Sequence, residues 1–272
     1  MSTPLVSAAW LLEHHLDPNV RVVDTRFVLG KPDAGREAFA SGHIPGAVFV
    51  DLERDLSDHP APDRRGGRHP LPAVAALEKS LSTLGISNEQ YVVAYDGGGF
   101  YAAHFWWMLR YLGHDKVSVL DGGLPAWTGP LETAARHYAG DFRAEPRTEM
   151  LVDAAYVQNR EDTTVLLDSR APERFRGDVE PLDWKAGHIP GAVNKDWANG
   201  LENGFYKPRE AQLERFKEVK GVAEVIVYCG SGVSAGANML ALELAGIHGA
   251  KLYAGSWSDW ASDDARPIAT GG

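Results

Sequence analysis

The chain carries one set of four motifs twice, in the same order. The heptapeptide GHIPGAV occurs at residues 42–48 and again at residues 187–193. An apolar run that ends in Asp-Thr-Arg or Asp-Ser-Arg precedes each copy, and a long apolar segment and a tryptophan-terminated segment follow it. Unrelated apolar runs would not recur in a fixed order. We therefore infer the duplication of a domain of roughly 120 residues.

Each half alternates strand-like and helix-like segments. Short runs rich in valine and leucine, at residues 20–23, 165–167 and 225–228, are typical of buried strands. Residues 237–245 combine strong helix formers with helical spacing. The alternation predicts an α/β fold with two tandem domains, each a mainly parallel sheet flanked by helices.

A polar stretch with two prolines, at residues 129–148, separates the two copies. Such composition is typical of a connection between domains. We therefore place the first domain at residues 8–132, the linker at 133–149 and the second domain at 150–270.

Charge and cysteine content exclude several classes of function. The formal net charge is -10, and no long basic stripe is present, so we expect no nucleic-acid partner. The densest basic stretch, Arg64, Arg65 and Arg68 beside His69, still allows a local cationic pocket for a small anion. A single cysteine excludes an intrachain disulfide and a cysteine-rich metal site. We predict neither a metal nor a cofactor.

The N-terminal residues do not resemble a signal peptide, and no run of about 18 apolar residues occurs. We expect a cytoplasmic protein without a membrane segment.

The single cysteine, Cys229, follows a strand-like run and precedes the sequence Gly-Ser-Gly-Val-Ser-Ala-Gly and a helix that begins near Ser234. The sulfur then lies at the carboxyl end of a parallel strand, where open α/β folds bind ligands. Glycines let backbone N–H groups turn toward the sulfur, and the helix N-terminus also favours an anion there. The alternative is an inert core cysteine. Asp96 is its equivalent in the first half and cannot carry sulfur.

These features resemble the tandem-domain rhodanese family over nearly the whole chain. In that family the second domain is catalytic and the first is an inactive copy, which matches Cys229 against Asp96. The loop CGSGVS is similar to the Cys-Gly-Ser-Gly-Val signature of 3-mercaptopyruvate sulfurtransferases. Thiosulfate-using rhodaneses usually have basic residues directly after the cysteine, where this chain has Gly230 and Ser231.

The resemblance implies roles for individual residues. Cys229 matches the sulfur carrier, Ser231 the serine beside the substrate, and Arg174 in PERFRG the arginine that binds the substrate's anionic group. His43 would face the site across the domain interface, with Asp33 as its orienting partner, because a serine, a histidine and an aspartate are proposed to relay a proton in some relatives. The remaining loop residues would also line the substrate site: Gly230, Gly232, Val233 and Ser234.

One position departs from the family pattern. Mercaptopyruvate enzymes commonly have a second arginine nine residues after the first, and this chain has Asp183 there. The departure weakens the expectation that 3-mercaptopyruvate is the strict donor.

The resemblance implies a ping-pong sulfurtransferase that passes sulfur through a Cys229 persulfide to cyanide, thioredoxin or another thiol. Two alternatives stay open, namely a thiosulfate sulfurtransferase with cyanide as acceptor and a relay module that accepts sulfur from a partner protein. A related phosphatase activity is disfavoured, because Ala235 stands where such enzymes have an arginine.

Overall fold

The computed structural model describes residues 3–272, which form two compact units. Unit 1 comprises the chain up to Ser57, together with Pro72–Arg147 and Asn203–Tyr206. Unit 2 comprises Asp58–Leu71, Thr148–Glu202 and Lys207–Gly272. A segment from the first half of the sequence, Asp58–Leu71, is therefore part of unit 2.

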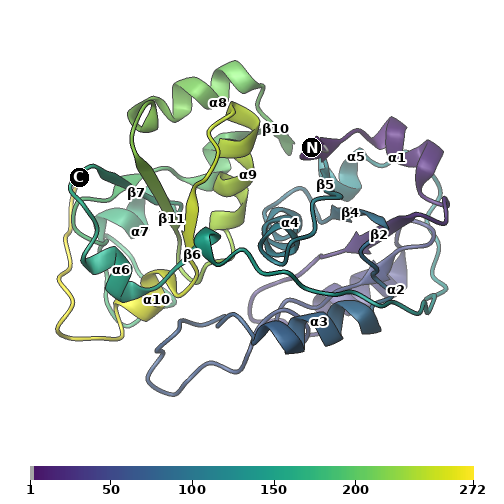
Figure 1. Cartoon of the computed structure of the whole chain (residues 1–272), viewed down its shortest axis with the longest axis horizontal. Coiled ribbons are helices and arrows are strands. Elements are labelled where there is room, and N and C mark those ends of the chain that lie inside the picture. The colour runs from purple at the N-terminus through teal and green to yellow at the C-terminus, as the bar shows by residue number, and fades with distance from the viewer. Residues whose placement is uncertain (1–2) are drawn as a thin grey trace. The chain divides into compact units, whose positions relative to one another are not determined.

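Unit 1 contains a five-stranded sheet with the order β1-β5-β4-β2-β3, in which every neighbouring pair is parallel. Its strands are β1 (Leu5–Val6), β2 (Val20–Asp24), β3 (Val48–Phe49), β4 (Tyr91–Tyr95) and β5 (Val117–Leu120). Its helices are α1 (Ala8–His14), α2 (Ala34–Ser41), α3 (Val74–Thr83), α4 (Tyr101–Tyr111) and α5 (Gly123–Ala126) (Figure 1).

Unit 2 contains a second parallel sheet, with the order β6-β12-β11-β7-β8. Its strands are β6 (Leu151–Val152), β7 (Thr164–Asp168), β8 (Val193–Asn194), β11 (Glu224–Tyr228) and β12 (Lys251–Tyr253). Its helices are α6 (Ala154–Gln158), α7 (Pro172–Arg176), α8 (Arg209–Arg215), α9 (Ala235–Ala245) and α10 (Ser256–Trp260). Its short 3-10 helices are η1 (Thr148–Met150), η2 (Trp197–Gly200) and η3 (Lys217–Val219). The hairpin strands β9 (Leu201–Glu202), of unit 2, and β10 (Phe205–Tyr206), of unit 1, form a separate two-stranded sheet.

The two five-stranded sheets have equivalent strand orders. In order across the sheet, β1, β5, β4, β2 and β3 of unit 1 correspond to β6, β12, β11, β7 and β8 of unit 2. The predicted α/β fold with two parallel sheets flanked by helices is confirmed. The parallel strands are nearly continuous apolar runs, as expected for sheets that helices cover on both faces.

The core of unit 2 shows how β11 is covered. Side chains alternate along a strand, so Ile226 and Tyr228 share one face. That face packs against Trp257 and Trp260 of α10 and against α6. The other face of β11 lies against α9 (Figure 1). This helix has apolar residues on all its sides, and nearly all of them are buried.

A buried ion pair fixes the repeated GHIPGAV motif in unit 1. Asp24, the last residue of β2, accepts hydrogen bonds from Arg26 and from the Tyr95 hydroxyl. Arg26 also donates to the Gly42 carbonyl at 2.8 Å, and Tyr95 accepts the Ile44 N–H at 3.2 Å. The motif is thus tied to β2 and β4 through side chains.

The same arrangement recurs in unit 2. Arg170 binds Asp168 through two nitrogens and donates to the Gly187 carbonyl at 2.7 Å. Tyr228 accepts the Ile189 N–H at 3.2 Å. The aspartates that end β2 and β7, Asp24 and Asp168, are therefore structural anchors of the two repeats.

The polar segment that we predicted as a linker packs on unit 1. Phe142 is fully buried, and the Arg21 guanidinium lies 3.5 Å from the centre of the Tyr138 ring. Arg143 forms an ion pair with Glu78 of α3. Residues 133–147 thus form a strap that has no regular secondary structure and packs on unit 1.

Within residues 3–272, each helix is too short or too polar to cross a lipid bilayer.

Candidate active site

Cys229 lies directly after β11, at the carboxyl end of the central strand of the unit 2 sheet, and it is 1% exposed. The turn between β12 and α10 supports it from one side. The Cys229 N–H donates to the Ser256 hydroxyl at 3.1 Å, and the Cys229 carbonyl accepts the Trp257 N–H at 3.0 Å. Ser256 has φ 55°, an uncommon value for a residue with a side chain. These contacts fix the backbone at the thiol without using the sulfur.

Gly232 lets the loop turn back over this support. Its φ is +82°, and a Cβ atom added there would lie 2.4 Å from the Ala254 carbonyl oxygen. A side chain at this position would therefore clash with backbone that cannot move away easily. The glycine is required for the loop to enclose Cys229.

The backbone N–H groups of this loop are not used in hydrogen bonds with the described part of the protein. The main-chain N–H groups of residues 230–235 have no protein acceptor within residues 3–272. Val233 is buried, and Ser234, the N-cap residue of α9, makes no side-chain capping bond to that helix. Free N–H groups in a turn and at the start of an 11-residue helix attract an anion. The loop around Cys229 thus has the donors that a thiolate or persulfide needs.

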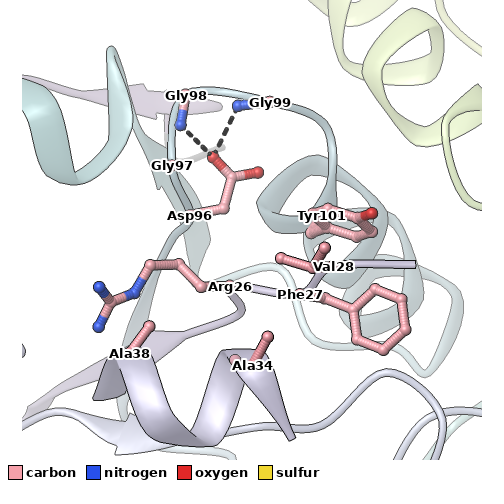
Figure 2. Close-up of a pocket in the computed structure, with 11 residues that line it drawn as sticks. Arg26, Phe27, Val28, Ala34, Ala38, Asp96, Gly97, Gly98, Gly99 and Tyr101 are labelled. Atoms are coloured by element: carbon pink, nitrogen blue, oxygen red, sulfur yellow. Dashed lines mark hydrogen bonds between the residues drawn. The ribbon is translucent and has the colours of Figure 1, made fainter. Parts of the chain in front are cut away.

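The equivalent loop of unit 1 holds its own anion. Asp96 accepts from the N–H groups of Gly98 at 2.7 Å, Gly99 at 2.9 Å and Ala102 at 3.1 Å. Figure 2 shows the carboxylate turned back into the loop, at the wall of a cavity of about 330 Å³. The carboxylate accepts from loop N–H groups, whereas the N–H groups of residues 230–235 in unit 2 have no protein acceptor within residues 3–272, and unit 1 has no cysteine in this loop.

We expect Asp96→Ala to destabilise unit 1. The change leaves three N–H groups without their charged acceptor, which should lower the free energy of unfolding by about 2–3 kcal/mol. Urea denaturation measures this loss. Asp33→Ala is the matched control in the same unit, because the Asp33 side chain is 62% exposed and should matter little. Equal stability losses in the two variants would contradict this role of Asp96.

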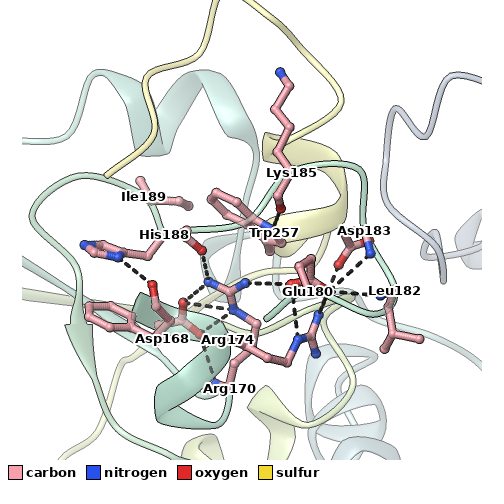
Figure 3. A network of polar contacts seen from close by, with 12 residues as sticks. Asp168, Arg170, Arg174, Glu180, Leu182, Asp183, Lys185, His188, Ile189 and Trp257 are labelled. Carbon is pink, nitrogen blue, oxygen red and sulfur yellow. Dashed lines mark hydrogen bonds and ion pairs between the residues drawn. The ribbon is translucent and has the colours of Figure 1, made fainter. Parts of the chain in front are cut away.

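Arg174, on α7, lies beside the cysteine loop. Its Nη1 would be 3.3 Å from a Cβ atom added at Gly230. Glu180 binds its other side, at 3.2 Å from Nε and 2.6 Å from Nη2, and also contacts Arg170 at 3.3 Å (Figure 3). Glu180 is only 3% exposed and was missed by sequence reasoning. It holds Arg174 so that Nη1 faces the loop.

The segment 58–71 supplies a second guanidinium. Arg68 forms an ion pair with Asp183 through Nη1, and its Nη2 would be 3.1 Å from a Cβ atom added at Gly230. Asp183 also contacts Arg174 at 3.3 Å. The aspartate that departs from the family pattern therefore bridges two arginines.

A histidine of the same segment contacts the loop serine. His69 Nδ1 lies 2.9 Å from the Ser231 hydroxyl oxygen. Burial lowers the pKa of His69 to about 4, and the positive charges of Arg68 and Arg64 add to this effect. The imidazole is therefore neutral at physiological pH, and its Nδ1 is placed to share a hydrogen bond with the serine hydroxyl.

This pKa predicts a pH effect on stability. In the unfolded chain His69 takes up a proton as the pH falls through about 6.5, whereas in the folded chain it does so only near pH 4. His69 therefore does not lower the free energy of unfolding above pH 6.5. It does lower this free energy as the pH falls from 6.5 toward 4, because only the unfolded chain then takes up the proton. We expect the free energy of unfolding to drop less between pH 7 and pH 5 in His69→Gln than in the unmodified chain.

Urea denaturation at the two pH values measures this difference. His59→Gln is the control, because His59 is exposed and lies in the same segment. A pH dependence in His69→Gln as steep as in the unmodified chain would contradict the assignment.

His43 and Asp33, the residues predicted to relay a proton, both belong to unit 1 and make contacts within that unit. His43 is fully buried in unit 1, where Nδ1 bonds to the Phe39 carbonyl at 2.8 Å and the ring stacks on Phe39. His188 of unit 2 makes the same contacts with Phe175. The motif histidine thus bonds to a backbone carbonyl and stacks on a phenylalanine in both repeats, and the histidine bonded to Ser231 is His69.

Asp33 is an exposed residue at the start of α2 and pairs with Arg54 at 2.8 Å. The His43 ring bonds through Nδ1 to a backbone carbonyl, and the carboxylate that lies 3.8 Å from its Nε2 is that of Glu132. The signal for His69 in the sequence is the basic run that ends in Arg68-His69, which we had read only as a possible anion pocket.

No cluster of histidine, cysteine, aspartate and glutamate side chains suited to a metal ion occurs within residues 3–272. The charged groups near Cys229 are instead paired with one another. They are three arginines and three carboxylates: Arg68, Arg170, Arg174, Asp168, Glu180 and Asp183.

Comparisons with known proteins agree with this geometry. The rhodanese-like domain family matches the chain at residues 7–130 and 153–263. A Pseudomonas aeruginosa protein named a probable 3-mercaptopyruvate sulfurtransferase is 44% identical over 99% of both chains. A Mycobacterium tuberculosis protein named as a thiosulfate sulfurtransferase is 41% identical over 94% of this chain and 92% of the relative.

A solved structure described as that of a 3-mercaptopyruvate sulfotransferase from Escherichia coli is similar in fold as well. Its TM-score is 0.83 at 37% identity, and the match covers 94% of this chain and 100% of that one.

The paired parallel sheets and the glycine loop after β11 define a tandem rhodanese, and the chain belongs to the rhodanese family. It is an enzyme of the sulfurtransferase type, close to the 3-mercaptopyruvate sulfurtransferases. The family resemblance seen in the sequence is confirmed.

Proposed function

We propose that the enzyme moves sulfane sulfur from 3-mercaptopyruvate to a thiophilic acceptor through a persulfide on Cys229. One observation carries the proposal. The Cys229 thiol lies in a loop whose six N–H groups, at residues 230–235, have no protein acceptor, whereas an aspartate fills the equivalent loop of unit 1. An open cradle of donors suits a sulfur anion that forms and disappears in each cycle.

The first half-reaction loads the cysteine. Arg174 binds the donor's carboxylate, and the Cys229 thiolate attacks the donor sulfur. The new S–S bond forms as the C–S bond breaks, and its electrons pass to the enolate of pyruvate. The loop N–H groups stabilise the persulfide that results.

Ser231 and His69 complete the proton balance. The Ser231 hydroxyl donates a proton to the departing enolate, which becomes pyruvate. The proton that the donor thiol gives up on forming the persulfide anion returns to the serine through His69. This neutral imidazole lies 2.9 Å from the serine oxygen and suits such a shuttle.

The second half-reaction requires an external acceptor. Cys229 is the only cysteine, so no thiol of the chain itself can attack the persulfide. Cyanide, thioredoxin or another thiol would remove the outer sulfur, return the thiolate and complete a ping-pong cycle.

The charges around the loop support a monoanionic donor. Gly230 and Ser231, directly after Cys229, add no charge, and Arg68 and Arg174 are both paired with Asp183. A dianion such as thiosulfate gains more than a monoanion from basic residues in the loop itself, and this loop has none. Thiosulfate is the second candidate, because a relative that is 41% identical is named for it.

Steady-state kinetics with each donor and cyanide as acceptor test the choice of donor. We expect a higher kcat/KM with 3-mercaptopyruvate. A higher kcat/KM with thiosulfate would reverse the assignment while leaving the sulfurtransferase class intact.

A further inference from the structure

We propose that Arg68 is a second donor-binding residue, which acts beside Arg174 at the cysteine loop. The inference rests on the proposed function, since it concerns the anionic group of the same donor. It assigns this role to a segment, residues 58–71, that lies far from the cysteine loop in the sequence.

The geometry directs two guanidinium groups to one point. A Cβ atom added at Gly230 would lie 3.1 Å from Arg68 Nη2 and 3.3 Å from Arg174 Nη1. Gly230 follows Cys229 directly, so both nitrogens lie against the same side of the cysteine loop. A carboxylate bound beside them would have one nitrogen of each arginine for its two oxygens.

These nitrogens are free to bind a ligand. Among residues 3–272, Arg68 Nη2 and Arg174 Nη1 donate to no protein acceptor, and Arg68 Nε is buried without a partner. The Arg68 side chain is only 10% exposed. A buried guanidinium normally uses its N–H groups, so the unused ones mark a place for an anion.

The carboxylate of Asp183 offsets the repulsion between the guanidinium groups of Arg68 and Arg174. One carboxylate oxygen binds Arg68 and the other binds Arg174, so a single buried aspartate joins them. Like charges at this spacing would otherwise repel. Asp183 therefore holds both guanidinium groups at the cysteine loop.

A purely structural ion pair is the competing explanation, and kinetics separate the two. Loss of a charge-assisted hydrogen bond to the donor should raise the KM for 3-mercaptopyruvate about 10- to 100-fold in Arg68→Gln, with kcat changed only a few-fold. Arg68→Lys, which keeps the charge but not the planar fork, should raise KM less. Arg65→Gln is the matched control, because Arg65 lies in the same segment with a side chain 79% exposed.

The result that overturns the inference is an Arg68→Gln enzyme with unchanged KM, or one in which only stability and kcat fall. If Arg68→Gln does not fold, Arg68→Lys decides, because a KM equal to that of the unmodified enzyme contradicts donor binding and a raised KM supports it. A different result would show that the proposed donor, 3-mercaptopyruvate, is wrong. The unmodified enzyme would then prefer thiosulfate, and a raised KM for thiosulfate in Arg68→Gln would still support Arg68.

Discussion

Replacing Cys229 by serine should abolish sulfur transfer while leaving the fold intact. Removal of an enzyme's nucleophile typically lowers kcat by roughly 10⁴-fold or more, and a serine hydroxyl cannot form a persulfide. The fold should survive, because the contacts that fix residue 229 use its main-chain atoms toward Ser256 and Trp257. Release of pyruvate from 3-mercaptopyruvate and thiocyanate formation from cyanide both measure the loss.

Thermal unfolding supplies the control for this experiment. We expect the melting temperature of Cys229→Ser to stay close to that of the unmodified chain, so that lost activity reports lost chemistry. Sulfur transfer by a folded Cys229→Ser enzyme at the unmodified rate would contradict a covalent role for the cysteine.

Arg170→Gln should cause the largest loss of stability. Arg170 is 1% exposed and lies between Asp168, which is fully buried, and Glu180. Burial acts to lower the pKa of Arg170, but the negative charges of Asp168 and Glu180 outweigh it and raise this pKa above its ordinary value. Removal of one partner leaves buried carboxylates uncompensated, which typically costs about 3–5 kcal/mol. Denaturant unfolding of unit 2 measures this loss.

The duplication provides a matched control in unit 1. Arg26→Gln removes the equivalent arginine, whose side chain is 17% exposed, so water can partly solvate the Asp24 carboxylate that remains. We expect a smaller loss of stability in Arg26→Gln than in Arg170→Gln. The account of the buried pair would be contradicted if Arg170→Gln were no less stable than Arg26→Gln.

The fold follows from features that a sequence displays directly. The predicted strand runs at 20–23, 165–167 and 225–228 lie within β2, β7 and β11, and the helical run 237–245 lies within α9. Local apolar pattern specifies such elements, and their repetition specifies the shared topology. Cys229 could be placed for the same reason, because a strand, a glycine loop and a helix follow one another in the chain.

The partners of the cysteine loop could not be placed in this way. Arg68 and His69 reach it from an irregular segment whose position depends on tertiary contacts, such as the bond from the Gly66 N–H to Asp259. No periodic pattern marks such a segment. His43 was a candidate because of the family resemblance, and in the structure His43 and its counterpart His188 both bond to backbone carbonyls.

The polar strap at 133–147 shows the same limit. Its composition resembles a linker, but Phe142 and Tyr138 dock it onto unit 1 through contacts with residues far away in the sequence. Composition reports the absence of regular secondary structure and cannot report where an irregular segment packs.

The mass of the intact enzyme after brief incubation with 3-mercaptopyruvate, in the absence of an acceptor, tests the central claim most directly. We predict a gain equal to one sulfur atom, located on the peptide that contains Cys229 and removed by cyanide. An enzyme that releases pyruvate while its mass stays unchanged under these conditions would contradict the persulfide mechanism.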